Sequence, residues 1–398
     1  MIDFEFQSPT RFVFGREAEK KTGELVRQNG GSKVLLHFGG GSIKRTGVYD
    51  KVVASLEQAG VGYLPLGGVK PNPREDLVRE GIDLVRREKI DFILAVGGGS
   101  TIDSSKAIAF GALYDGDFTD YSFGKDAKVM RPVPAALPIG TVLTIAAAGS
   151  EGSCNCVISL GPKKLKRTIT GDRLRPRFSV LNPEFTFTLP PYQTACGLTD
   201  IFAHVVERYF TPTTDVLVTD ELCEAVMRTV VAESAAVMKN PSDYQARANI
   251  MWAGSLAHND LTGCGNDGGD FASHMLEHEM GGMFDVTHGA GLAAIWPSWA
   301  RYVYKNCLPR FVRYAVNVMG VEATGTDEEI ALKGIEAMED FYHSIDMPTN
   351  FKELGIAPTE DQIVAMAESC LSACGGPKGS AKLLYLEDMI NIYRMANR

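Results

Sequence analysis

Side chains that could bind a metal ion gather between Asp200 and His288. Five of the seven histidines of the chain lie in this stretch. Asp200 and His204 are four residues apart, as are His274 and His278, so each pair would share one face of a helix. Imidazole and carboxylate groups together suit Zn²⁺ or Fe²⁺. The spacing therefore indicates a metal site in which three histidines and one aspartate leave room for a substrate oxygen.

An ordinary structural role is the alternative for each of these histidines. His258 stands alone before Asn259, so we interpret it as a core or surface residue. Two spaced pairs followed by a further histidine are harder to explain in this way, and spacing alone leaves both interpretations open. The order of residues from Leu276 to Glu279 does not match the HExxH motif of zinc proteases, which disfavours a metalloprotease.

The elements that position these residues must come from a chain of 398 residues, for which two domains are expected. A content of 45% hydrophobic and 22% charged residues is typical of globular proteins. The net charge of -9 argues against binding to nucleic acid or to anionic membranes. The sequence has neither a membrane-spanning apolar run nor a signal peptide, so we expect a cytoplasmic location. The eight cysteines are scattered, which indicates free thiols.

Strands and helices alternate in the N-terminal half. Residues 4–7 and 10–15 alternate between apolar and polar side chains and predict a short N-terminal strand pair. Further strands are expected at 33–38, 61–66 and 92–96, with helices at 17–29, 48–60, 76–88 and 101–110. This order is typical of a parallel, Rossmann-like α/β sheet.

Two of the predicted strands end in the same sequence, Gly-Gly-Gly-Ser, at residues 39–42 and 97–100. Ligands of open α/β sheets bind beyond the carboxyl ends of the strands, where glycine lets the backbone approach a phosphate. Neither run matches the G-x-G-x-x-G or Walker A pattern. A nucleotide site of unspecified type is therefore expected.

The C-terminal half is different, because almost every periodic segment after Leu189-Pro-Pro191 is helical. We therefore predict an α/β domain at 1–189 and a helical, metal-binding domain at 190–398. Before this boundary, a basic segment at 163–167 joins two predicted strands, 157–160 and 178–181. This segment is either a solvated hairpin or the source of one lysine that faces a phosphate.

Several of these motifs together resemble the iron-containing (group III) alcohol dehydrogenases, over nearly the whole chain. Within this family, the sequence most resembles the branch of the NADPH-dependent butanol dehydrogenases and aldehyde reductases. The glycine loops at 39–47 and 97–103, Pro71-Asn-Pro73, Leu189-Pro-Pro191 before Asp200, and the His274, His278, His288-Gly series carry the resemblance. One departure is Ala148-Gly-Ser-Glu151, where the family usually has threonine in the first position.

The resemblance implies the dehydroquinate synthase-like fold, one divalent metal, Fe²⁺ or Zn²⁺, and NADP(H) lying between the two domains. The implied metal ligands are Asp200, His204, His274 and His288. The implied cofactor-binding residues are Gly40, Gly41, Ser42, Asn72, Gly99, Ser100, Asp103, Thr144, Lys166 and Thr188. His278 resembles a histidine close to the nicotinamide and is the candidate for relaying a proton. A homodimer is also typical of the family.

The expected reaction is hydride transfer between NADP(H) and a short to medium primary alcohol or aldehyde such as butanol or butanal. NADPH is expected because the loop at 39–45 contains no acid that would bind the 2′-hydroxyl of NAD. The alternatives are a dehydroquinate synthase-like or other NAD- and metal-dependent enzyme of the same fold, or a metal-dependent hydrolase. A hydrolase leaves both glycine loops unexplained.

Overall fold

The structure is a computed structural model that describes residues 1–162 and 165–398. Lys163 and Lys164, from the basic segment, lie outside the described residues. The chain forms two compact units. The first, which we call the sheet unit, contains residues 8–189 and 241–255, and the helical unit contains residues 1–7, 190–240 and 256–398. The predicted division into domains 1–189 and 190–398 stays a prediction.

A six-stranded sheet with the strand order β1-β8-β5-β4-β2-β3 forms the centre of the sheet unit, and all its neighbouring strands are parallel. This confirms the predicted parallel α/β sheet. The strands are β1 (Arg11–Phe14), β2 (Lys33–Gly39), β3 (Gly62–Val69), β4 (Phe92–Gly97), β5 (Ile139–Leu143) and β8 (Phe178–Leu181). The helices are α1 (Thr22–Gln28), α2 (Ser42–Arg45), α3 (Val48–Gln58), α4 (Glu75–Glu88) and α5 (Gly99–Gly111).

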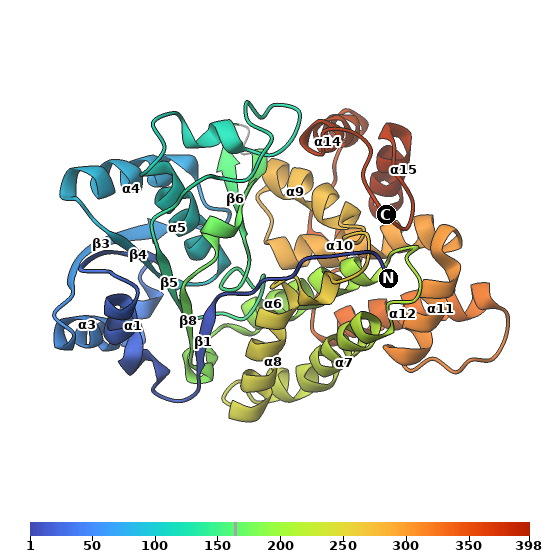
Figure 1. Ribbon diagram of the computed structural model, residues 1–398. Helices are drawn as coiled ribbons and strands as arrows, with labels where there is room; N and C mark the ends of the chain where they lie inside the picture. Colours follow the sequence, from blue (N-terminus) through green and yellow to red (C-terminus); the bar gives the residue numbers. More distant parts are fainter. Residues whose placement is uncertain (163–164) are drawn as a thin grey trace. The chain divides into compact units, whose positions relative to one another are not determined.

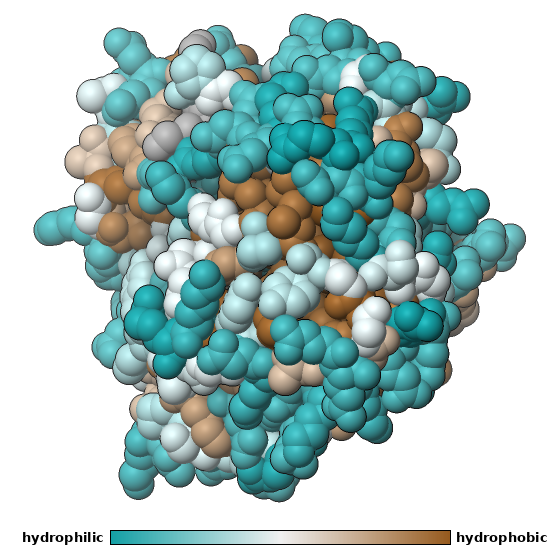
Figure 2. Space-filling view, turned by 90° about the vertical axis from the view of Figure 1, so that its left-hand side faces the viewer, coloured by the Kyte–Doolittle hydropathy of each residue, from teal (hydrophilic) through white to brown (hydrophobic). Residues whose placement is uncertain are grey.

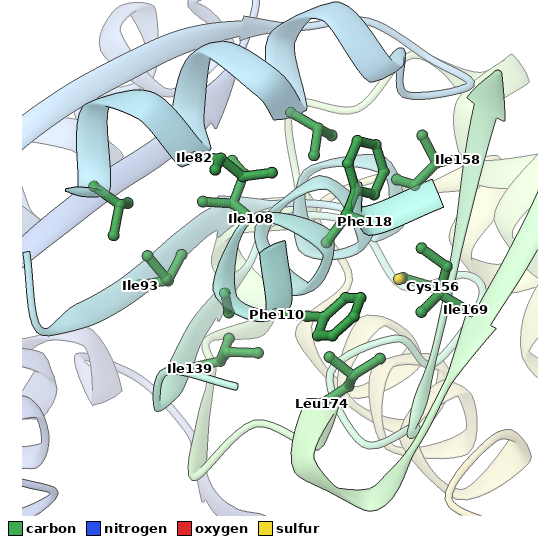
Figure 3. Close-up of a cluster of buried hydrophobic side chains, with 14 of the residues drawn as sticks. Ile82, Ile93, Ile108, Phe110, Phe118, Ile139, Cys156, Ile158, Ile169 and Leu174 are labelled. Atoms are coloured by element: carbon green, nitrogen blue, oxygen red, sulfur yellow. The ribbon is translucent and has the colours of Figure 1, made fainter. Parts of the chain in front are cut away.

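Helices cover both faces of this sheet, so alternate residues of each strand enter different hydrophobic cores. Leu35 and Ile93 pack in the core that contains α4 and α5, which Figure 3 shows around Ile108 and Phe110. Val34 and Leu94 instead enter the core built with α1 and α3. The two helix layers can be followed in Figure 1. Burial on both faces explains the nearly continuous apolar sequence of β2 and β4.

Two local predictions in the sheet unit need correction. Residues 4–7 form no strand, and β1 pairs in parallel with β8 instead of with a neighbouring N-terminal strand. The strand at 178–181 likewise belongs to the main sheet, whereas β6 (Asn155–Leu160) pairs with β7 (Leu165–Thr170) in a separate antiparallel hairpin. Alternation identifies a strand but does not identify its partner, which depends on long-range packing.

The helical unit is built around α10 (His288–Val303), which packs against α6, α9, α12 and α15. Its side chains Trp296 and Trp299 are completely buried. The other helices of this unit are α6 (Pro191–Tyr209), α7 (Leu217–Lys239), α9 (Ala272–Phe284), α11 (Leu308–Asn317), α12 (Asp327–Ser344), α13 (Phe351–Leu354), α14 (Glu360–Ala373) and α15 (Leu386–Ala396). Helix α8 (Tyr244–Ala257) packs mostly with the sheet unit. The predicted helical C-terminal half is confirmed.

The surface is mixed in character. Figure 2 shows one face, on which hydrophilic side chains predominate and hydrophobic side chains gather near the middle. Such a mixture is normal, because roughly half of the surface of a folded protein is apolar. Among the described residues, none of the helices has the length and apolar character needed to cross a membrane.

Candidate metal and cofactor sites

Three helices of the helical unit bring the predicted metal ligands together. Asp200 and His204 lie one turn apart on α6, His274 lies on α9, and His288 is the first residue of α10. Gly289 allows this close approach, since a Cβ atom at this position would lie 2.2 Å from the Cys196 carbonyl oxygen of α6. Helix packing thus joins residues that are far apart in the sequence.

The donor atoms converge on the carboxylate of Asp200. The Nε2 atoms of His274 and His288 lie 3.8 and 3.7 Å from Asp200 Oδ1, and His204 Nδ1 lies 3.0 Å from it. Asp200 Oδ1 and His274 Nε2 are buried and have no hydrogen-bond partner among the described residues. Burying polar atoms without partners is unfavourable, and a bound cation would satisfy both of them. The donor set therefore fits a divalent metal such as Fe²⁺ or Zn²⁺.

Two glutamates form hydrogen bonds with the histidines, and both were missed in the sequence. Glu207 accepts a hydrogen bond from His274 Nδ1, and Glu277 accepts one from His288 Nδ1. Both carboxylates are completely buried. Carboxylate–histidine–metal arrangements of this kind are common, because the second partner fixes the ring. The available signal was spacing, since Glu207 lies three residues after His204 and Glu277 three residues after His274.

Burial and charge set the protonation of the metal-free site. Burial alone would raise the pKa of Asp200, but the neighbouring His204 and His288 hold it well below its usual value. Burial lowers the pKa of His204, and the nearby His274 lowers it further. Burial also opposes the charged form of His274, yet Glu207 and Asp200 outweigh this and raise its pKa to about 9. Glu207 and Asp200 thus favour positive charge on His274.

His278 lies beside the metal ligands. It is 8% exposed, and its ring centre is 5.7 Å from that of His288 and 6.3 Å from that of His274. The donor atoms of Glu277, His278 and His288 also lie within 4.8 Å of one another. This position is compatible with the predicted proton relay. His258, interpreted from the sequence as a structural residue, stacks against His204 with ring centres 4.2 Å apart.

The two glycine loops lie at the carboxyl ends of β2 and β4, which are neighbouring strands. Gly40 and Gly41 follow β2, Gly41 has a φ angle of 102°, and Ser42 begins α2. Gly99 and Ser100 begin α5. Thr144 follows the next strand, β5, and its backbone N–H donates to the Gly97 carbonyl over 3.1 Å. The structure therefore groups these predicted cofactor residues at one edge of the sheet.

Other predicted cofactor residues have structural contacts of their own. The Asp103 carboxylate accepts from the Val157 backbone N–H over 2.9 Å, which ties α5 to β6. Asn72 has a φ angle of 54°, and Lys166 is a buried residue of β7. Thr188 is exposed. The cofactor roles of these four residues stay predictions.

A buried lysine that the sequence analysis did not identify secures the loop around Ala148. Lys106 of α5 is completely buried, and its ammonium group donates to the carbonyls of Ser150, Ser153 and Asn155 over 2.7–2.9 Å. Burial lowers the pKa of Lys106. No sequence pattern signals this role, because the acceptors are three backbone carbonyls and the Ser153 hydroxyl, all 44 to 49 residues away in the chain.

Comparison with known proteins agrees with this arrangement. Residues 9–183 match the family model "Iron-containing alcohol dehydrogenase", and residues 194–397 match "Fe-containing alcohol dehydrogenase family, C-terminal". NADH-dependent butanol dehydrogenase A of Clostridium acetobutylicum is 39% identical over 99% of both chains. The NADPH-dependent aldehyde reductase YqhD of Escherichia coli is 35% identical over 89% of this chain and 90% of its own.

A solved structure agrees equally well. The crystal structure of NADH-dependent butanol dehydrogenase A from Thermotoga maritima superposes with a TM-score of 0.94 at 38% identity, covering 100% of this chain and 99% of the other. Membership of this family implies a nicotinamide cofactor and a divalent metal. The chain therefore belongs to the iron-containing alcohol dehydrogenase family.

Proposed function

We propose that this protein interconverts short to medium aliphatic aldehydes and primary alcohols with NADP(H), and that Asp200, His204, His274 and His288 hold one divalent metal. The observation that carries the proposal is the convergence of three histidines on a buried carboxylate oxygen that has no hydrogen-bond partner among the described residues. When bound, the reduced nicotinamide supplies the hydride and the metal polarises the carbonyl oxygen of the aldehyde.

The protein's own residues bind the substrate and manage the proton. The ring centres of Phe271 and His274 are 5.8 Å apart. Phe271, Met275 and Phe284 offer half-buried apolar surface on and beside α9. His278 is our candidate for delivering the proton that the product alcohol requires, since an unperturbed imidazole has a pKa of about 6.5. These residues favour an uncharged, apolar substrate.

Arg208 does not alter this conclusion, although its guanidinium lies 4.8 Å from the centre of the Phe271 ring. Its Nη1 donates to the carbonyls of His204 and Ala257, and its Nη2 lies 3.7 Å from Asp260. The Arg208 guanidinium is thus already paired with groups of the protein. We therefore expect a butanal-like aldehyde to react better than a keto acid.

The test is an anaerobic assay of the metal-reconstituted protein, in which the absorbance of NADPH is followed after an aldehyde is added. The expected result is rapid oxidation of NADPH with butanal and the reverse reaction with butanol. A strong preference for an anionic keto acid, or no turnover of any aldehyde with either cofactor, would contradict the proposal.

NADPH is proposed as the preferred cofactor because the loop after β2 is suited to an added phosphate. It contains no acid, and the space beside the Gly41 Cα is open. Lys44 lies 5.1 Å from the centres of the Phe38 and Tyr49 rings, which keeps its charge close to this loop. The names of the relatives divide on this point, since the butanol dehydrogenases are called NADH-dependent and YqhD is called NADPH-dependent.

Ser42→Asp tests the cofactor preference, because a carboxylate at this position would repel a 2′-phosphate. We expect kcat/KM for NADPH to fall by roughly tenfold or more, equivalent to about 1.4 kcal/mol, with little change for NADH. Gln58→Asp, which adds the same charge at an exposed position of α3, is the control and should change neither value. Equal efficiency with both cofactors in the unmodified protein would refute the preference.

The expected homodimer and cytoplasmic location also stay predictions.

A further inference from the structure

Two buried glutamates contact the proposed metal ligands but are not proposed as ligands themselves. Glu207 lies on α6 and Glu277 on α9, and neither is exposed to solvent. Each accepts a hydrogen bond from the Nδ1 atom of a histidine, Glu207 from His274 and Glu277 from His288. Both interactions thus join a carboxylate to a histidine Nδ1 atom, although the two glutamates lie on different helices.

These contacts decide which ring nitrogen can bind a metal. A neutral imidazole has one N–H group, and an ionised carboxylate can only accept a hydrogen bond. A proton on Nδ1 leaves the Nε2 lone pair free, and the Nε2 atoms of His274 and His288 are those that face Asp200. We infer that Glu207 and Glu277 are positioning residues that hold both histidines in the metal-binding tautomer. This inference rests on the metal site of the proposed function.

Both carboxylate oxygens of Glu207 have hydrogen-bond partners that fix the orientation of the side chain. Its Oε1 atom accepts from the His274 backbone N–H over 2.9 Å and from the Ser273 hydroxyl, whereas Oε2 faces His274 Nδ1. In Glu207→Gln the backbone N–H requires the amide oxygen on its own side. The amide NH₂ must then face Nδ1, which favours the tautomer with a proton on Nε2. This isosteric change would therefore present an N–H group to the metal.

Glu277 packs against α10. Its side chain occupies the space beside Gly291, where a Cβ atom would lie 2.9 Å from Glu277 Oε1. Replacing Glu277 by glutamine removes the negative charge that holds the proton on His288 Nδ1. We therefore expect Glu277→Gln to weaken the metal-binding tautomer as well.

His204 is oriented within its own helix, because its Nδ1 atom lies 3.0 Å from the Asp200 carboxylate of α6. The same atom also lies 2.9 Å from the Asp200 backbone carbonyl, one turn earlier in the same helix. The backbone of α6 can therefore orient this ring. The two glutamates serve the ligands contributed by α9 and α10, which have to be aligned across helix boundaries.

The test measures Zn²⁺ affinity by competition with a chromogenic chelator, using the full-length protein without cofactor or aldehyde. Residues that form hydrogen bonds with metal-binding histidines typically contribute 10–100-fold to metal affinity. We expect Glu207→Gln and Glu277→Gln each to weaken Zn²⁺ binding by about 10–100-fold. Glu224→Gln is the matched control and should bind Zn²⁺ within twofold of the unmodified protein. Glu224 is 1% exposed in the same unit and accepts hydrogen bonds from Tyr209 and Asn317, away from the metal ligands.

A second measurement separates orientation from a general loss of stability. The visible spectrum of the Co²⁺-loaded protein reports ligand geometry, so Glu207→Gln should change it while Glu224→Gln should not. Unchanged affinity and spectrum in both variants, or equal losses in the control, would overturn the inference. If Glu207→Gln does not fold, the result for Glu277→Gln decides. If His288→Ala also retains full Zn²⁺ affinity, the metal site itself is wrong, which distinguishes the two failures.

Discussion

Asp200 shows how one residue can define a site. Its carboxylate is buried, and its Oδ1 atom faces nitrogen atoms of three histidines. Without a cation, protons on the rings offset part of the cost of this burial; against the effect of burial, Glu207 and then Asp200 raise the pKa of His274. A metal ion would replace those protons.

The first prediction concerns the ligands themselves. His204→Ala and His288→Ala each remove one proposed ligand, so we expect activity to be lost. Metal affinity should fall by more than about 100-fold, which exceeds the effect expected from a residue that only contacts a ligand. Affinity in the unmodified protein should also fall in mild acid, where protons compete for imidazole. Metal analysis after dialysis provides the measurement. Full metal content and activity in both variants would contradict the ligand assignment.

The second prediction concerns His278. If it relays the proton, His278→Gln should lower kcat by roughly 100-fold, which is within the usual contribution of a general acid. Metal content and KM for NADPH should remain nearly unchanged, and the pH dependence of kcat should become flatter. Steady-state kinetics across pH and metal analysis of the same preparation test this. A kcat within twofold of the unmodified protein would limit His278 to shaping the pocket.

At the scale of elements, His37 connects three parts of the sheet unit. It lies on β2, its Nδ1 atom donates to the Leu66 carbonyl of β3, and its Nε2 atom accepts from the Ser104 hydroxyl of α5, both over 2.8 Å. Burial lowers the pKa of His37 to about 4. Because burial makes the charged ring unfavourable, the folded protein holds His37 in its neutral form.

The third prediction follows from this pKa. The unfolded chain binds a proton at His37 below a pH of about 6.5, whereas the folded chain does so only near pH 4. Stability is therefore fully present above pH 6.5 and decreases as the pH falls toward 4, by about 2 kcal/mol between pH 7 and 5. Urea unfolding of His37→Gln should show this much less loss over that interval. The exposed His343→Gln is the control and should retain the full pH dependence.

The position of the glycine loops also depends on how the elements are arranged. They follow β2 and β4, which are hydrogen-bonded neighbours, and both introduce helices. Parallel pairing therefore places both loops at one edge of the sheet, where open α/β sheets bind their ligands. This arrangement supports the Ser42→Asp test of cofactor preference.

At the scale of the whole molecule, the proposed metal ligands all lie in the helical unit and the glycine loops all lie in the sheet unit. A ligand that binds only folded protein stabilises it by an amount that depends on its concentration relative to Kd. The two units should therefore respond differently to the metal and to NADPH.

The fourth prediction is that adding Zn²⁺ at 100 times its Kd stabilises the helical unit by about 2.7 kcal/mol. For a unit of roughly 200 residues this corresponds to an increase in Tm of about 5–10 °C. Differential scanning calorimetry with and without a chelator provides the measurement. His288→Ala should lose most of the shift. A shift of the same size in that variant would indicate that Zn²⁺ stabilises the protein at other positions.

The sequence by itself determined the features that depend on neighbouring residues. Helical spacing paired Asp200 with His204 and His274 with His278, and the apolar runs ending in glycine predicted the parallel sheet with its loops. These patterns are local, because helices and strands repeat over a few residues. The family resemblance then supplied the combined ligand set that spacing had left open.

Only the tertiary structure decided which residues meet across elements. It paired β1 with β8, placed Glu207 behind His274, and inserted Lys106 among the carbonyls of the 150–155 loop. None of these contacts leaves a periodic pattern, since each depends on the packing of segments that are distant in the chain. The orientation of His288 at the proposed metal site also depends on tertiary structure, because Glu277 can contact its Nδ1 atom only after α10 has docked against α9.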